Sequence, residues 1–279
     1  MVMRSSGKGD PSSDEESILV KGGVQSVEIG MEILVTLADR GGEETLGMLA
    51  RATGMPAAKA HRYLVSLIKA GFVERNLGKY VLGPQALRVG LIALGRLDVV
   101  EIVTPALYEL RDKIDGTVML ALWGENGPTI VRWIESMRPV TVNVRVGSLM
   151  PLIRSATGQV FCAFLPETMT RTLLTAELAT AKKQNLDIRT LADAHAMFSA
   201  VRETGLGHTA GAVLSGVLGL AAPIFDHNGS LAAVIACLGP VGFFDDSLDG
   251  ATARALRDIA NDLSRRLGYC APEHQPRQV

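Results

Sequence analysis

The segment "LGMLARATGMPAAKAHRYL", residues 46–64, constrains the fold more than any other stretch, because it holds two short helical patterns around a chain break. Thr45 is a good N-cap for the first pattern. "GMP" then breaks the chain, and Pro56 suits the first position of a second helix that runs to Gly71. Two short helices around a turn of three or four residues predict a helix-turn-helix.

The flanking segments extend this motif into a winged domain at 23–83. Residues 24–39 predict an amphipathic helix that ends at the glycine pair 41–42. The apolar positions that predict it, at spacings of three and four, are Val24, Val27, Met31, Leu34 and Val35. After the motif, β-prone runs at 72–75 and 79–82 flank a glycine-containing turn, so we expect a β-hairpin, the wing.

A helical wheel divides the second helix of the motif into two faces. The apolar face, which we expect in the core, consists of Ala57, Ala60, Leu64, Leu67 and Ile68. The opposite face consists of Ala58, Lys59, Arg62, Ser66 and Lys69. It carries a small side chain near its N-terminal end and three cations after it. A recognition helix enters the DNA major groove by its N-terminal end, where small side chains let the backbone approach and the helix dipole favours phosphates.

These residues carry the predicted DNA contacts. Arg62 suits a guanine edge or a phosphate, while Lys59 and Lys69 suit phosphates. His61 lies at the edge of the core face, where packing or a backbone contact is favoured over base readout. The alternative is a solvated amphipathic helix, but the order of break, helix and wing favours DNA. The predicted DNA-binding residues are Thr45, Ala57, Ala58, Lys59, His61, Arg62, Ser66, Lys69 and Lys79.

Length and charge indicate two domains, of which only the first is basic. The chain has 279 residues, more than the about 100 to 200 residues of a typical domain. Its formal net charge of -1 gives no overall attraction to nucleic acid. Residues 21–96 nevertheless hold ten lysines and arginines against six aspartates and glutamates, a local excess of +4. DNA binding is therefore expected from this region alone.

The spacing of the cysteines and the lengths of the apolar stretches argue against metal sites, disulfide frameworks and membrane segments. Cys162, Cys237 and Cys270 lie far apart, without the CxxC pairs or dense spacing of zinc sites and disulfide frameworks. We expect no metal, no cofactor and a reducing, cytoplasmic location. The first residues lack the apolar stretch of a signal peptide, and "SLAAVIACLGPVGFF" falls short of the roughly 18 apolar residues of a membrane helix. No membrane association is expected.

The remaining residues predict an α+β domain at 99–270, after a linker helix at 84–98, with disordered tails at 1–22 and 271–279. A helical pattern covers 103–114, and another covers 248–267. Further helices are predicted by "GQVFCAFLPETMTRTLL" and "LADAHAMFSAVRETG". Strands are predicted by "TVMLALW", "TIVRWIES", "VTVNVRVG" and, around a turn at "DHNG", by "VLGLAAPIFDHNGSLAAVIACLGP". Strands in runs favour an antiparallel α+β layer over a doubly wound parallel sheet.

Several blocks together resemble one family. "VQSVEIGMEIL", "LARATGMPAAKAHRYLVSLIKAGFVER", "GKYVLGPQALRVG", "LPETM" and "GLAAPIFDHNG" are similar, in order, to bacterial transcriptional regulators of the isocitrate lyase regulator (IclR) family. The resemblance implies an N-terminal winged helix-turn-helix and a C-terminal GAF-like effector domain. It also implies a homodimer, or a dimer of dimers, that binds a palindromic DNA operator. Family recognition helices commonly carry Ser or Thr where this chain has Ala57 and Ala58.

The resemblance also implies where a small-molecule effector binds. The implied contacts lie in "GSLMPLIRSATG" and on later strands, and they are Leu149, Leu152, Ala156, Thr157, Gly158, Thr209, Val217, Gly219, Ala236 and Leu238. Most are apolar or small, which favours an aromatic or branched acid over a polar dicarboxylate. Arg154 or Arg132 is a candidate partner for a carboxylate, against the alternative of a surface contact. "SATG" offers free amides at a helix start, or simply an N-cap supplied by Thr157.

A catalytic function finds little support in the sequence, and we expect no enzyme. His208 and His227 have no Cys or acidic neighbour at metal-ligand spacing, and Cys162 falls in an apolar helical run that favours a buried thiol. Two other classes stay open. One is a small-molecule sensor that acts only through protein partners, and the other is a hydrolase with a degenerate DNA domain.

Overall fold

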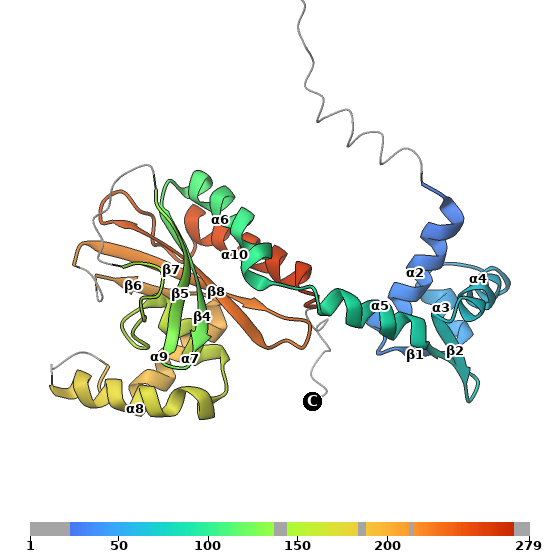
Figure 1. The fold of residues 1–279 in the computed structure, drawn as a ribbon, viewed down its shortest axis with the longest axis horizontal. Coiled ribbons are helices and arrows are strands. Elements are labelled where there is room, and N and C mark those ends of the chain that lie inside the picture. The colour runs from blue at the N-terminus through green and yellow to red at the C-terminus, as the bar shows by residue number, and fades with distance from the viewer. Residues whose placement is uncertain (1–22, 137–143, 184–187, 212–214, 271–279) are drawn as a thin grey trace, which may run out of the picture. The chain divides into compact units, whose positions relative to one another are not determined.

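The computed structural model describes residues 23–136, 144–183, 188–211 and 215–270 (Figure 1). The chain divides into two compact units, Met1–Arg96 and Leu97–Val279. Each unit has its own hydrophobic core.

The first unit is a winged helix-turn-helix. Its elements are α2 (Gln25–Asp39), β1 (Glu43–Glu44), α3 (Leu46–Ala52), α4 (Ala57–Lys69), β2 (Val73–Asn76), β3 (Lys79–Leu82) and α5 (Pro84–Leu94). The strands form an antiparallel sheet in the order β1-β3-β2, in which the very short β1 was not predicted. The core joins Ile33 of α2 and Leu49 of α3 to Leu64 of α4, with Val73 and Tyr80 from the wing. The predicted fold class is confirmed.

Two predicted apolar faces in this unit are wrong in detail. The residues that α2 buries are Gly30, Ile33 and Leu37. Four of the five apolar residues that predict the helix are exposed, namely Val24, Val27, Met31 and Val35. In α4, Ala57 and Ile68 are also exposed, because only the middle of the helix lies over the core. Helix α2 therefore has two apolar faces, one of which no described residue of this unit covers.

The second unit is an antiparallel five-stranded sheet with helices on both faces. Its helices are α6 (Val99–Ile114), α7 (Ala156–Phe164), α8 (Glu167–Lys183), α9 (Leu191–Thr204) and α10 (Ala251–Arg266). Its strands are β4 (Thr117–Gly124), β5 (Gly127–Ile134), β6 (Gly207–Ala210), β7 (Val217–Phe225) and β8 (Leu231–Pro240), in the order β5-β4-β8-β7-β6. Helices α6 and α10 lie side by side on one face, and α7 and α9 cover the other (Figure 1).

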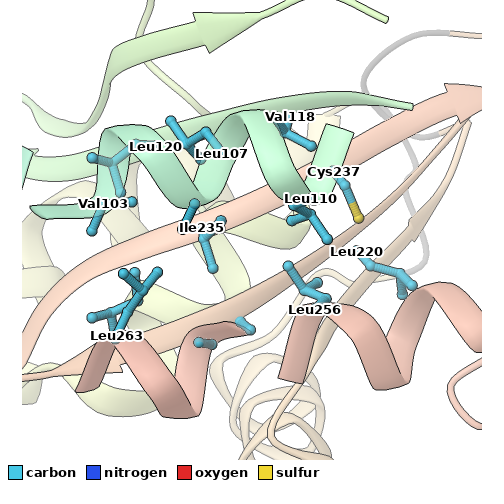
Figure 2. Close-up of a cluster of buried hydrophobic side chains, with 14 of the residues drawn as sticks. Val103, Leu107, Leu110, Val118, Leu120, Leu220, Ile235, Cys237, Leu256 and Leu263 are labelled. Atoms are coloured by element: carbon cyan, nitrogen blue, oxygen red, sulfur yellow. The ribbon is translucent and has the colours of Figure 1, made fainter. Parts of the chain in front are cut away.

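Alternating side chains give the sheet two apolar faces, as period-two strands require. Val118 and Leu120 of β4 point to the core under α6 and α10, whereas Met119 and Ala121 point to the core under α7. Figure 2 shows the first of these cores, where side chains of α6 and α10 meet those of β4, β7 and β8. A ligand pocket on this sheet has to form on the α7 face or at a strand end.

Two predictions for this unit are wrong, one strand was not predicted, and one predicted strand lies partly outside the described residues. The predicted single helix in "GQVFCAFLPETMTRTLL" is two helices, because Leu165 is extended before Pro166, which cannot continue a helix. Strand β6 was not predicted. Ser155, not Thr157, caps α7. Of the predicted strand "VTVNVRVG", residues 140–143 lie outside the described residues and 144–147 are not in a strand.

Candidate DNA interface and ligand pocket

The start of α4 exposes its first backbone amides. Pro56 is the N-cap, and it offers no side-chain hydrogen bond. The amides of Lys59 and Ala60 donate to the carbonyl of Pro56 at 2.9 and 3.1 Å, so those of Ala57 and Ala58 precede the first helical bonds. Both alanines are exposed. An anion can reach these amides without meeting a longer side chain.

Three cations lie on α4 behind these alanines. Arg62 and Lys69 are exposed and Lys59 is half-buried. Within the described ranges, none of the three forms an ion pair. Their charge is therefore available to an outside anion.

The other predicted polar contacts are already engaged. Thr45 caps α3 by accepting a bond from the amide of Met48 at 3.3 Å. Ser66 Oγ donates to the carbonyl of Arg62 at 3.2 Å. Lys79 pairs with Glu43, Nζ to Oε1 at 2.7 Å, and this carboxylate raises the pKa of the lysine. Glu43 thus offsets the charge that the wing was expected to present at Lys79.

His61 links the recognition helix to the wing. It is exposed rather than packed in the core, and its Nδ1 lies 3.2 Å from the hydroxyl of Tyr80 on β3. The ring of Tyr80 is buried in the core of this unit. This side-chain contact joins β3 to α4, and the predicted DNA contact of His61 stays a prediction.

The second unit contains a pocket on the α7 face of the sheet, beside β6. Its lining is mostly apolar, and none of the described lining residues is charged. The lining residues are Met119, Val144, Met150, Ser155, Ala156, Thr157, Thr209, Val217, Leu218, Gly219, Leu220, Ala236, Cys237 and Leu238. A mostly apolar lining with a few polar groups is typical of sites that bind small organic ligands.

The start of α7 supplies the polar end of this pocket. Ser155 accepts a bond from the amide of Gly158 at 2.9 Å, which leaves the amides of Ala156 and Thr157 before the first helical bonds. Thr157 Oγ1 is buried and, in the described structure, has no hydrogen-bond partner. A buried hydroxyl without a partner costs free energy, so Thr157, which lines the pocket, is a candidate to hydrogen-bond a ligand.

Seven of the residues implied by the family resemblance line the pocket: Ala156, Thr157, Thr209, Val217, Gly219, Ala236 and Leu238. The other three do not. Leu149 is exposed, and Leu152 is buried in the core with its amide bonded to Glu177 Oε2 at 2.6 Å. Gly158 packs α7 against the preceding loop, since a Cβ there would lie 2.1 Å from the carbonyl oxygen of Pro151.

Neither candidate arginine lies in the pocket lining. Arg154 contributes its backbone carbonyl, which accepts a bond from Thr209 Oγ1 at 3.0 Å and so fixes β6 beside α7. Arg132 is exposed on β5 and donates to the carbonyl of Val131. A carboxylate in the pocket would therefore meet amides and a hydroxyl rather than a guanidinium.

Sequence reasoning missed half of the lining. Met119 could have been found, because it alternates with Val118 and Leu120, whose faces are fixed by the opposite core. Val144 and Met150 come from an irregular segment, and no periodicity places such residues.

Comparison with known proteins places these features in a family. Residues 26–77 match the model of the IclR helix-turn-helix domain, and residues 91–265 match that of the bacterial transcriptional regulator IclR C-terminal domain. The second match alone spans more than half of the chain. The chain belongs to the IclR family. It is thus a DNA-binding transcriptional regulator.

Individual IclR-family relatives are similar over nearly the whole chain. The crystal structure of Pseudomonas aeruginosa HmgR is 40% identical, covers 88% of this chain and 99% of its own, and has a TM-score of 0.80. The glycerol operon regulatory protein of Streptomyces griseus is 31% identical, with 88% of this chain and 97% of the relative covered. The HTH-type transcriptional regulator KipR of Bacillus subtilis (strain 168) is 29% identical, with 81% and 90% covered.

Two cysteines of this IclR-family chain, Cys162 and Cys237, are buried. Burial raises the pKa of Cys162 and of Cys237 to about 12, so both stay protonated near neutral pH and are poor nucleophiles. Among the described residues, no cluster of three metal-ligating side chains forms, and no helix is long and apolar enough to cross a membrane.

Proposed function

We propose that the pocket binds an organic monocarboxylate with an aromatic or branched body, and that this effector changes operator binding by the first unit. The observation that carries the proposal is the unpartnered hydroxyl of Thr157 at the start of α7. A carboxylate there accepts bonds from this hydroxyl and from the amides of Ala156 and Thr157. Met119, Val217 and Leu238 then contact the apolar body.

A thermal-shift screen tests this proposal. The acids are benzoate, phenylacetate and isovalerate, set against the small polar acids glyoxylate and pyruvate, with benzamide as the uncharged match of benzoate. A ligand at a hundred times its dissociation constant stabilises the folded state by about 2.7 kcal/mol, which raises the melting temperature by several degrees. At least one of the first three acids should do so. Stabilisation by the small polar acids alone would contradict the proposal.

The same proposal assigns operator contacts to α4. The amides of Ala57 and Ala58 suit one phosphate, Lys59 and Lys69 suit others, and Arg62 suits a base edge in the major groove. The test is selection of duplexes of roughly 40 base pairs from a random pool, long enough for two half-sites one helical turn apart. A palindrome should be enriched. A sensor that acts only through protein partners would enrich none.

We further propose that the chain acts as a homodimer in the cytoplasm, with pairing of dimers as a further step. Helix α2 exposes Val24, Val27, Met31 and Val35, and α5 buries none of its residues. The exposed apolar side chains of α5 are Leu87, Val89, Leu91, Ile92 and Leu94. Such faces suit a second copy of the chain, and two-fold symmetry matches two half-sites. A monomer at micromolar concentration in the ultracentrifuge, still binding with full affinity, would contradict this.

A further inference from the structure

The wing ends in a two-residue loop that holds an unusual leucine. Asn76 pairs with Lys79 across the hairpin, so the loop consists of Leu77 and Gly78. Both have positive φ, 47° at Leu77 and 86° at Gly78. This is the backbone of the tightest hairpin turns, whose first central position normally holds Asn, Asp or Gly. A leucine there is strained, because its Cβ crowds the backbone.

No packing of the Leu77 side chain offsets this strain. Its side chain is 98% exposed, more than any other large apolar side chain that the structure describes. A single exposed apolar residue is ordinary on a protein surface. The combination of full exposure with a left-handed backbone is not, since Asn at this position would relieve the strain and suit water better.

The loop is held in place by contacts of Tyr80 on β3. Arg75 lies on β2 with its guanidinium 6.0 Å from the centre of the Tyr80 ring. The hydroxyl of Tyr80 meets His61 of α4, so the wing is held against the recognition helix within this unit. Figure 1 shows the hairpin of β2 and β3 extending beyond the helices. When α4 lies in a major groove, a hairpin fixed beside it reaches over one phosphate strand to the adjoining minor groove.

We propose that Leu77 is an apolar wedge that enters the minor groove next to each half-site and partly unstacks a pyrimidine–purine step. Leucine is among the side chains that open base steps in this way, and TA and CA/TG steps open most easily. The side chain of Leu77 is almost fully exposed, so it is free to enter the groove. The proposal rests on the proposed binding of α4 to an operator, and it adds bending of the DNA and a preference at the step that Leu77 opens.

The test uses the full-length protein and the duplex that wild type enriches from the random pool. Two variants are compared, Leu77→Asn, which suits the positive φ, and Leu77→Met, which keeps an apolar side chain of similar length. Affinity is measured by fluorescence anisotropy, bending by energy transfer between the duplex ends, and folding by the melting temperature. A second duplex replaces the flanking pyrimidine–purine step by a stiff A-tract.

We expect Leu77→Asn to melt no lower than wild type, to bind the enriched duplex roughly tenfold more weakly and to bend it less. Leu77→Met should stay within about twofold of wild type in affinity. Replacing the flanking step by the A-tract should lower the affinity of the wild-type protein but not that of Leu77→Asn.

Three outcomes would overturn the proposal. Leu77→Asn with normal affinity and bending would show that Leu77 is no wedge while operator binding stands. A lower melting temperature for Leu77→Asn, with weaker binding to all duplexes, would show that Leu77 supports the hairpin fold instead. Failure of wild type to enrich any duplex would overturn the proposed operator binding together with the wedge.

Discussion

Helices α4 and α7 begin alike and differ in where the first turn lies. Each starts with small residues, Ala57 and Ala58 in α4 and Ala156 and Thr157 in α7, so each offers backbone amides to an anion. The start of α4 is exposed and followed by cations, whereas that of α7 is buried in an apolar pocket without a charged side chain. The same local geometry therefore suits two different anions. The exposed start of α4, with cations behind it, suits a DNA phosphate. The buried start of α7 suits a single carboxylate on an apolar molecule.

The largest effect is expected from a negative charge at the exposed helix start. Ala58→Glu should weaken operator binding by roughly a hundredfold, because the carboxylate repels phosphate and blocks the approach of the backbone. The same charge suits the dipole at a helix N-terminus, so the melting temperature should not fall. Anisotropy titrations with the enriched duplex measure the loss. Ala58→Ser, the matched control, should bind as wild type does, and an equal loss for it would mean that size alone matters.

A comparable loss, in this case of ligand binding, is expected when a larger side chain on the pocket wall occupies the pocket. A Cβ on Gly219 lies 3.3 Å from Thr209 Cγ2 and 3.4 Å from the carbonyl oxygen of Cys237, so a larger side chain must extend into the pocket. Gly219→Leu should abolish the thermal shift that the best acid produces and leave operator binding without the acid intact. A normal thermal response in this variant would mean that the ligand binds elsewhere.

Removal of the Thr157 hydroxyl should give an intermediate effect. Thr157→Val keeps the shape of the side chain but loses one bond to a charged group, which is worth about 1.5 to 3 kcal/mol, or roughly ten- to a hundredfold in ligand affinity. Without ligand the variant should melt at or above the wild-type temperature, because an unpartnered buried hydroxyl is gone. Calorimetric titration measures the affinity. A drop in melting temperature with unchanged affinity would make the hydroxyl structural.

The smallest effects separate base contacts from phosphate contacts on α4. Arg62→Ala should cost about 1 to 3 kcal/mol on the enriched duplex and less on random DNA, as expected for a base contact. Lys69→Ala should weaken both kinds of DNA alike and lower the salt slope by about one unit. If both variants lost equal affinity for the enriched duplex and for random DNA, Arg62 would be a phosphate contact and not a base contact.

The sequence predicts the helix starts better than it predicts their surroundings. Proline and glycine act locally, so Pro56 and Gly71 mark α4 without knowledge of the rest of the fold. In α2, both faces carry apolar residues, and periodicity alone could not show that Ile33 rather than Met31 is buried. Burial depends on contacts between distant segments, which local patterns do not contain.

The same limit applies to the pocket. The family resemblance suggests Thr157 as a contact, but that its hydroxyl is buried without a partner depends on the packing of α7 against strands far along the chain. Gly158 was expected to contact ligand, yet its missing side chain serves the close approach of residues 151–152. The positive φ of Leu77 likewise follows from the pairing of Asn76 with Lys79, because leucine does not favour that conformation by itself.

One salt titration of both binding steps tests the central contrast between the two helix starts. A dimer that neutralises phosphates through Lys59 and Lys69 of each protomer should lose roughly a hundredfold in operator affinity between about 50 mM and 200 mM salt. The best acid, bound at the buried start of α7, should change its affinity by less than about twofold over that range, because the screening ions do not enter the pocket. Equal salt dependence of the two steps would contradict the account, since it would place the carboxylate at the surface beside cations.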